Sequence, residues 1–157
     1  MRRLIILAVA VMLAGLTGCS KYKDIKITSA VLENISPYGL RGAEVALAVE
    51  IDNPTVMAKI SDIEAEVEYS GKVLGKVTLD PFTLKRKTVE TYHLKGKLIF
   101  DQSLTLADLI MVLDKNFIEN CLVDFTAKGT IRGGLSKTVT RNDVPLKKLL
   151  EYAENKK

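Results

Sequence analysis

Cysteine, histidine, proline and tryptophan are all scarce in this chain of 157 residues. Two cysteines are too few for a disulfide-stapled scaffold or a four-cysteine zinc site. The single histidine, His93, excludes a His-rich metal centre and leaves little for acid–base catalysis. Four prolines and ten glycines exclude collagen-like and proline-rich low-complexity chains. What remains, 47% hydrophobic and 27% charged residues, is typical of one packed globular domain.

The N-terminal segment has the composition of an export signal. Arg2 and Arg3 precede an uncharged apolar run over residues 4–16. As a helix this run would cover roughly 20 Å, whereas the hydrocarbon core of a bilayer is about 30 Å thick. The run is therefore too short to span a membrane, and its length is that of a signal-peptide core.

The end of this segment resembles a bacterial lipobox. Leu16-Thr17-Gly18-Cys19 matches the pattern of Leu, a small or polar residue, Gly or Ala, and then Cys. By this resemblance the chain is cleaved between Gly18 and Cys19, and the Cys19 thiol carries a diacylglycerol. Residues 1–18 are then the lipoprotein signal peptide, 19–24 a lipid-anchored tether and 25–157 the folded domain. The alternative is an ordinary signal or short anchor that ends in a buried cysteine.

Cleavage changes the charge balance and sets the location of the protein. Loss of Arg2 and Arg3 lowers the basic count from 23 to 21 against 19 acidic residues, and a net charge of +2 does not indicate a nucleic-acid binder. The expected location is the cell envelope, outside the cytoplasm. The expected partners are the membrane, through the diacylglyceryl cysteine, and a lipid or envelope protein. Ser20 in place of Asp favours the outer membrane, facing the periplasm, in a Gram-negative cell.

Alternation of apolar and polar residues predicts a β-rich domain after the tether. The clearest case is residues 44–52, where four apolar side chains share one face: Val45, Leu47, Val49 and Ile51. Seven segments are predicted as strands in this way: 25–35, 44–52, 63–69, 73–79, 88–100, 122–132 and 135–140. Their short, regular spacing indicates an all-β sandwich.

Several irregularities are expected within these strands. Ile60 lies out of phase with Ile63, which predicts a bulge near Ser61-Asp62. Gly96 stands on the inward face of its strand, where a bulge or a close approach of another segment would explain it. Residues 80–84 are interpreted as a segment that crosses between strands. The first strand is predicted to turn four side chains inward: Ile25, Ile27, Val31 and Ile35.

The period changes to that of a helix over residues 106–117. The apolar residues of this segment fall on one helical face: Leu106, Leu109, Ile110, Leu113 and Phe117. Thr105 and Asp108 have the spacing of a capping box, and Pro145 is expected to open a short C-terminal helix. The predicted fold class is all-β: a β-sandwich of about seven strands with one inserted amphipathic helix and a short C-terminal helix.

A run of motifs extends over residues 45–97. A strand runs into Asn53-Pro54 (VEIDNPTV), a second strand ends in Tyr (ISDIEAEVEY), and a glycine hairpin (SGKVLGKVTL), Asp80-Pro81 and the basic-polar run KRKTVET follow. Together these motifs resemble a type-2 late-embryogenesis-abundant domain, also called the water-stress and hypersensitive-response (WHy) domain. Two positions depart from the family pattern: Thr55 replaces a second Asn, and Arg86-Lys87 stand where Gly is frequent.

The resemblance carries expectations about fold and function. It implies an immunoglobulin- or fibronectin-III-like β-sandwich with no known catalytic centre. It also implies an association with desiccation or stress tolerance, with membrane tethering, and in some relatives with lipids or other apolar ligands. Fold alone does not determine function, so these remain expectations.

Five polar or reactive features each have a structural and a functional interpretation. Asn53-Pro54 is either a turn or a binding loop, His93 either faces solvent or is a general base, and Cys121 is either buried or a reactive or cross-linking thiol. Glu64, Glu66 and Glu68 are either solvated or a cation site. Lys85-Arg86-Lys87 are either solvated or in contact with anionic head groups. The structural interpretation is favoured throughout, so no catalytic residue, metal ligand or cofactor is predicted.

The leading functional prediction is a non-enzymatic, membrane-anchored envelope lipoprotein that acts as a binding or stress-protection module. The alternative is a carrier of lipid or another apolar ligand, with a cavity between the sheets and the 106–117 helix as a lid. A third hypothesis, an enzyme, would need Asp52, Asp80 and Asp101 to converge with His93 in one cleft.

Overall fold

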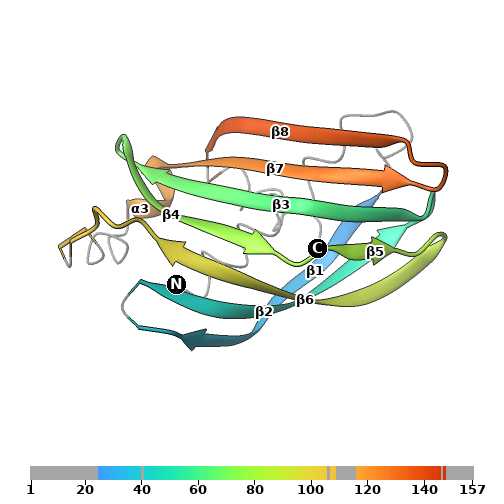
Figure 1. Ribbon diagram of the computed structural model, residues 1–157, viewed down its shortest axis with the longest axis horizontal. Coiled ribbons are helices and arrows are strands. Elements are labelled where there is room, and N and C mark those ends of the chain that lie inside the picture. The colour runs from blue at the N-terminus through green and yellow to red at the C-terminus, as the bar shows by residue number, and fades with distance from the viewer. Residues whose placement is uncertain (1–24, 40, 106, 109–115, 146, 148–157) are drawn as a thin grey trace.

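The computed structural model describes residues 25–39, 41–105, 107–108, 116–145 and 147 (Figure 1). Within these residues the chain forms eight strands and the one-turn helix α3 (Phe117–Asn120). The strands are β1 (Lys26–Pro37), β2 (Gly42–Asn53), β3 (Ala58–Tyr69), β4 (Lys72–Leu79), β5 (Phe82–Leu84), β6 (Thr88–Phe100), β7 (Cys121–Ile131) and β8 (Ser136–Pro145). The prediction of a β-rich fold is confirmed.

The strands belong to one antiparallel sheet, in the order β1-β2-β6-β4-β3-β7-β8. Strand β4 joins the two halves of this sheet, because it pairs with β3 on one edge and with residues 96–100 of β6 on the other. The short β5 pairs with the first residues of β3. Figure 1 shows that the sheet is strongly curled: β3, β7 and β8 run side by side, while β1 crosses behind them at a steep angle.

The inner face of the curled sheet holds one apolar core. Strand β2 contributes the predicted Val45, Leu47, Val49 and Ile51, all buried. Strand β3 contributes both Ile60 and Ile63, although their spacing is out of phase. The register with β7 shifts between Ser61 and Glu64, and Asp62 has a φ of 52°. The predicted bulge is therefore confirmed, since an extra residue returns the second isoleucine to the inner face.

The predicted inward face of β1 is wrong at one position. Val31 is 48% exposed, and Ala30 lies against the core in its place. The register with β2 shifts twice, between Ile27 and Ser29 and again between Leu32 and Asn34. Each one-residue shift exchanges the two faces of a strand, so the first shift turns Val31 outward and the second brings Ile35 back to the core.

Two features that depend on glycine agree with the predictions from sequence. Strands β3 and β4 are joined by Ser70 and Gly71, whose φ values of 50° and 80° are those of a type I′ hairpin turn. Gly96 lies where β4 crosses onto β6: a Cβ there would be 2.2 Å from the carbonyl oxygen of Thr78. The expected close approach at Gly96 is thus a contact between the two halves of the sheet.

Three sequence predictions differ from the structure or fall outside it. Residues 82–84, interpreted as a crossing segment, form the short strand β5 and raise the strand count to eight in the described residues. Pro145 is the last residue of β8, opposite Leu122, where an edge strand tolerates a residue without an N–H, and residue 147 just beyond it is helical. Most of the 106–117 helix and of the C-terminal helix lies outside the described residues.

The start of the predicted 106–117 helix is described and has the expected cap. The Asp108 carboxylate accepts the Thr105 N–H and hydroxyl at 2.7 Å each, and the Thr105 hydroxyl accepts the Asp108 N–H at 3.3 Å. Lys72 on β4 donates to the same carboxylate at 2.7 Å. The Lys72 hydrogen bond, followed by those from Thr105, holds the pKa of Asp108 well below its usual range. The capping box is therefore confirmed.

Candidate functional site

The predicted lipidation site lies in the part of the chain that the structure leaves undescribed. Gly18 and Cys19 precede residue 25, where the description begins, so cleavage and acylation remain predictions from sequence. None of the described helices is long and apolar enough to cross a membrane. The described residues do establish where the chain enters the domain from this segment, which is at the first residue of β1.

Three connections gather at the end of the molecule where β1 begins. Lys26 pairs with Asp52 near the end of β2, and Asn53 pairs with Thr88 at the start of β6. Ala58, the first residue of β3, pairs with both Leu84 and Ile131. The β2–β3, β5–β6 and β7–β8 connections therefore lie together with the start of β1, on the right in Figure 1. We call this region the tether end.

Asn53 organises the tether end. Its side chain is fully buried, with 0% of the residue exposed. The amide nitrogen donates to the carbonyl oxygens of Val56 and Lys85, both at 2.7 Å. The amide oxygen accepts the N–H of Thr55 at 3.2 Å and its hydroxyl at 3.0 Å. The amide thus satisfies its full bonding capacity, and it fastens the β2–β3 connection to the β5–β6 connection.

The sheet has a seam at this end, since β5 pairs with β3 and the first half of β6 pairs with β2. Two aromatic rings bridge that seam: Phe82 and Tyr92 have centroids 5.3 Å apart. The Tyr92 hydroxyl accepts the N–H of Lys85 at 2.9 Å, and the Lys85 ammonium pairs with Glu90 at 2.6 Å. The Asn-Pro motif therefore lies in a firmly held junction, as the structural interpretation of Asn53-Pro54 anticipated.

Apolar side chains protrude from the tether end. Met57 before β3 is 48% exposed, Val89 at the start of β6 is 63% exposed, and Leu135 after the β7–β8 turn is 71% exposed. Their gathering could not be recognised from sequence, because it depends on which connections share an end of the sheet. The available signal was only that each large apolar residue stands beside a turn.

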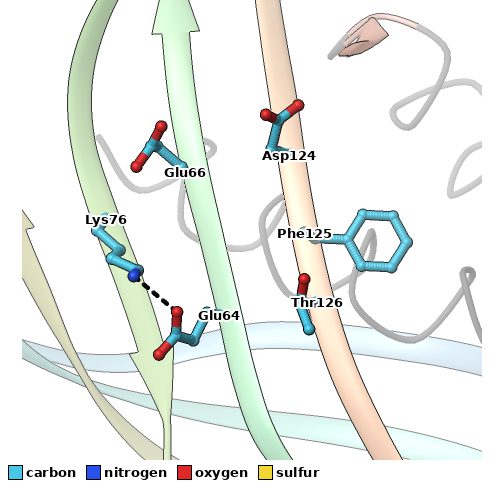
Figure 2. Close-up of a pocket in the computed structure, with 6 residues that line it drawn as sticks. All are labelled: Glu64, Glu66, Lys76, Asp124, Phe125 and Thr126. Carbon is cyan, nitrogen blue, oxygen red and sulfur yellow. Dashed lines mark ion pairs between the residues drawn. The ribbon is translucent and has the colours of Figure 1, made fainter. Parts of the chain in front are cut away.

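The acidic face of β3 forms a shallow depression with its neighbours (Figure 2). It has a volume of about 210 Å³ and is lined by Glu64, Glu66, Lys76, Asp124, Phe125 and Thr126. Lys76 donates to Glu64 at 2.6 Å, and this hydrogen bond raises the pKa of Lys76. Asp124 accepts the N–H of Asp143 at 2.7 Å. The described residues contain no group of three side chains placed to hold a metal ion.

His93 and Cys121 occupy opposite environments. The His93 side chain is 68% exposed, and its Nδ1 lies 2.9 Å from the Glu33 carboxylate. Among the described residues, neither Asp52, Asp80 nor Asp101 forms a hydrogen bond or ion pair with it. Cys121 is a buried free thiol, and burial raises its pKa to about 12. Both structural interpretations, a solvated histidine and a buried cysteine, are confirmed.

Comparison with known proteins leaves the family open. No family model matches the chain, and no curated protein matches it. Three solved structures share a weak likeness. A protein from Archaeoglobus fulgidus has 14% identity and a TM-score of 0.42, with 74% of this chain and 93% of that one covered. The yeast GGA1 GAE domain has 9% identity and a TM-score of 0.31 (76% and 97% covered), and the archaellum periplasmic stator protein FlaG from Sulfolobus acidocaldarius has 10% identity and a TM-score of 0.27 (73% and 99% covered). Likeness at this level assigns neither a family nor an activity.

Proposed function

We propose that this protein is a non-enzymatic lipoprotein of the cell envelope, held on a membrane by acylated Cys19 and acting outside the cytoplasm as a binding or stress-protection module. The observation that carries the proposal is the order of segments at the N-terminus. A basic start, an apolar run of signal-peptide length and Leu16-Thr17-Gly18-Cys19 are followed within a few residues by the first strand. Two or more acyl chains on one cysteine suffice for stable anchoring.

The finer fold belongs to the same proposal. We assign the body to the immunoglobulin- or fibronectin-III-like sandwiches of the type-2 late-embryogenesis-abundant class. In support, the strands are antiparallel, β2 ends at the buried Asn53 of the motif, and the Ser70-Gly71 hairpin follows β3. These features match the sequence motifs on which the resemblance rests.

A test of the anchor compares Cys19→Ser with Cys121→Ala, each expressed as the full chain and labelled with an alkyne analogue of palmitate. Membranes are washed in about 0.5 M salt, which screens surface electrostatics. We expect wild type and Cys121→Ala to carry the label and stay with membranes, and Cys19→Ser to carry none and be released. Recovery of an intact N-terminus, Met1 included, from wild-type cells would contradict the proposal.

The alternative, an apolar-ligand carrier, needs an apolar cavity of about 300 Å³ or more. The depression at Glu64 and Lys76 is about 210 Å³ and polar, and it lies on the outer face of the sheet, so it is not such a cavity. Native mass spectrometry of protein purified from its own cells separates the two functions. A carrier would retain a stoichiometric lipid in addition to the acyl chains on Cys19.

A further inference from the structure

We propose that the tether end is a bilayer-docking surface: its exposed apolar side chains enter the interface of the membrane that holds the anchor, and its cations contact the phosphates of anionic lipids. The surface consists of Met57, Arg86, Lys87, Val89, Arg132 and Leu135. The inference rests on the proposed lipid anchor and adds to it a fixed orientation of the body.

The apolar part of this surface consists of three side chains. Six large apolar side chains are well exposed in the described residues, and three of them, Met57, Val89 and Leu135, lie at the tether end. Tyr38 and Ile99 lie at the opposite end, without the unpaired cations of the tether end. The three at the tether end come from three separate connections that share this end only because of the sheet topology. Side chains of this kind beside cations are what an interfacial membrane-binding surface requires.

The charges at the two ends of the molecule differ. The connecting residues 54–57, 85–87 and 132–135 contain four basic residues and no acidic one. Lys85 pairs with Glu90, but Arg86, Lys87 and Arg132 have no ion-pair partner among the described residues. At the opposite end, Asp108 pairs with Lys72 and Glu119 with Lys147, Asp101 has no ion-pair partner among the described residues, and Arg41 lies in the β1–β2 connection. An anionic bilayer therefore attracts the tether end, at about 1 kcal/mol per basic residue near the surface.

The length of the tether restricts how the body can stand on the membrane. From Cys19 to Lys26 is seven residues, which span at most about 25 Å along any path. A strand of twelve residues such as β2 is about 40 Å long. Because β1 starts at the tether end, the body can rest on the membrane at that end, whereas standing upright on the opposite end would lift Lys26 beyond the reach of the tether.

The surface is also preorganised. Asn53 and Tyr92 fix the β5–β6 connection through Lys85, as described above. The β7–β8 turn is closed by hydrogen bonds from Ile131 N–H to the Leu135 carbonyl at 3.0 Å and from Gly134 N–H to the Ile131 carbonyl at 3.1 Å. Docking on a membrane would therefore require little ordering of the described backbone.

The experiment places a fluorophore sensitive to water at each end of the full lipoprotein, purified from membranes and reconstituted. Ser136→Cys reports the tether end and Ser70→Cys the opposite end; buried Cys121 is shielded from the label. Vesicles contain either phosphatidylcholine alone or a mixture with 30% phosphatidylglycerol. We expect a blue shift at position 136, with quenching by lipid-borne quenchers, in the anionic vesicles, and no such shift at position 70.

Two variants test the parts of the surface. We expect Arg86→Gln/Lys87→Gln/Arg132→Gln and, separately, Met57→Ser/Val89→Ser/Leu135→Ser to remove at least half of the shift at position 136 while flotation with vesicles persists. The matched control, Lys95→Gln/Lys97→Gln/Arg141→Gln, changes the same charge elsewhere and should leave the shift intact. Thermal unfolding of each variant checks that the body is folded.

The outcomes separate the two proposals. If wild type fails to float with vesicles, the anchor and the docking inference both fall. If it floats but the probe at position 136 stays in water, docking alone is overturned. A shift that grows with protein density and resists lipid-borne quenchers would assign the surface to a second copy of the chain, and would overturn membrane docking as well.

Discussion

Asn53 is the one buried polar side chain in the core of the described residues, and its four hydrogen bonds explain why a polar residue is tolerated there. Sequence predicted a turn at Asn53-Pro54, because Asn tolerates turn dihedrals and caps with its side chain while Pro ends the strand. It could not predict the bond to Lys85, 32 positions along the chain, because that contact exists only once β2 and β6 pair.

Replacing Asn53 should therefore lower the stability of the fold. Asn53→Ala removes the amide donor from the carbonyls of Val56 and Lys85, and leaves Lys85 only the longer bond from the Thr88 hydroxyl at 3.3 Å. We expect a loss of about 2–4 kcal/mol in the free energy of unfolding, measured in urea. Asn34→Ala is the matched control, because the Asn34 amide is exposed and bonds only Ser36; its effect should stay within about 0.5 kcal/mol. Equal effects for the two variants would contradict the role of Asn53.

Cys121 gives a prediction on pH. Burial raises the pKa of its thiol from 9.0 to about 12, so the folded state keeps this proton at pH values where the unfolded chain has lost it. The contribution of Cys121 to stability is therefore complete below pH 9 and is lost as pH rises toward 12. We expect the stability difference between wild type and Cys121→Ala to change over that window. We also expect no alkylation by iodoacetamide at pH 8 until denaturant is added; rapid labelling of the native protein would be the contrary result.

At the scale of elements, strands with uninterrupted alternation were predictable and strands with shifts in register were not. Strand β2 follows its pattern throughout, and β3 shows its bulge through two isoleucines out of phase. In β1, the shifts that turn Val31 outward leave no comparable mark, because its apolar residues are compatible with either face. Strand β5 is only three residues long, too short for any period to appear.

The junction between β4 and β6 should be intolerant of any side chain at Gly96. An added Cβ would meet the Thr78 carbonyl at 2.2 Å, so Gly96→Ala must push the two halves of the sheet apart. We expect a loss of about 3 kcal/mol in urea unfolding, at the upper end for an overpacked site. Gly129→Ala on β7, where the nearest atom would be 3.8 Å from the new Cβ, should cost less than about 1 kcal/mol. Equal losses of unfolding free energy for the two variants would show that the contact between Gly96 and Thr78 can relax.

At the scale of the whole molecule, the two ends of the body differ in their unpaired cations, and no pattern along the sequence predicts this difference. The residues of the tether end are spread over positions 57 to 135, and each is unremarkable in its own segment. Their juxtaposition follows from the strand order, which local periodicity does not encode. The segment Leu16-Thr17-Gly18-Cys19, in contrast, is contiguous, so its resemblance to a lipobox could be seen from four residues.

Anchoring and orientation should respond differently to salt. The proposed acyl chains on Cys19 would hold by apolar burial, whereas Arg86, Lys87 and Arg132 would act through charges that about 0.5 M salt largely screens. We expect the wild-type protein to float with anionic vesicles at all salt concentrations, while the fluorescence shift at position 136 declines between about 0.1 and 0.5 M. A shift independent of salt would mean that the cations contribute nothing to docking.

The antiparallel ladder between β1 and β2 has a mechanical consequence. A pull on the proposed lipid anchor would enter the body at Lys26 and, when it acts along β1, would point away from the far end of β2. Force in that direction shears the whole ladder at once instead of opening its rungs one after another. A domain held by this strand would therefore resist a pull along β1 better than a pull across it.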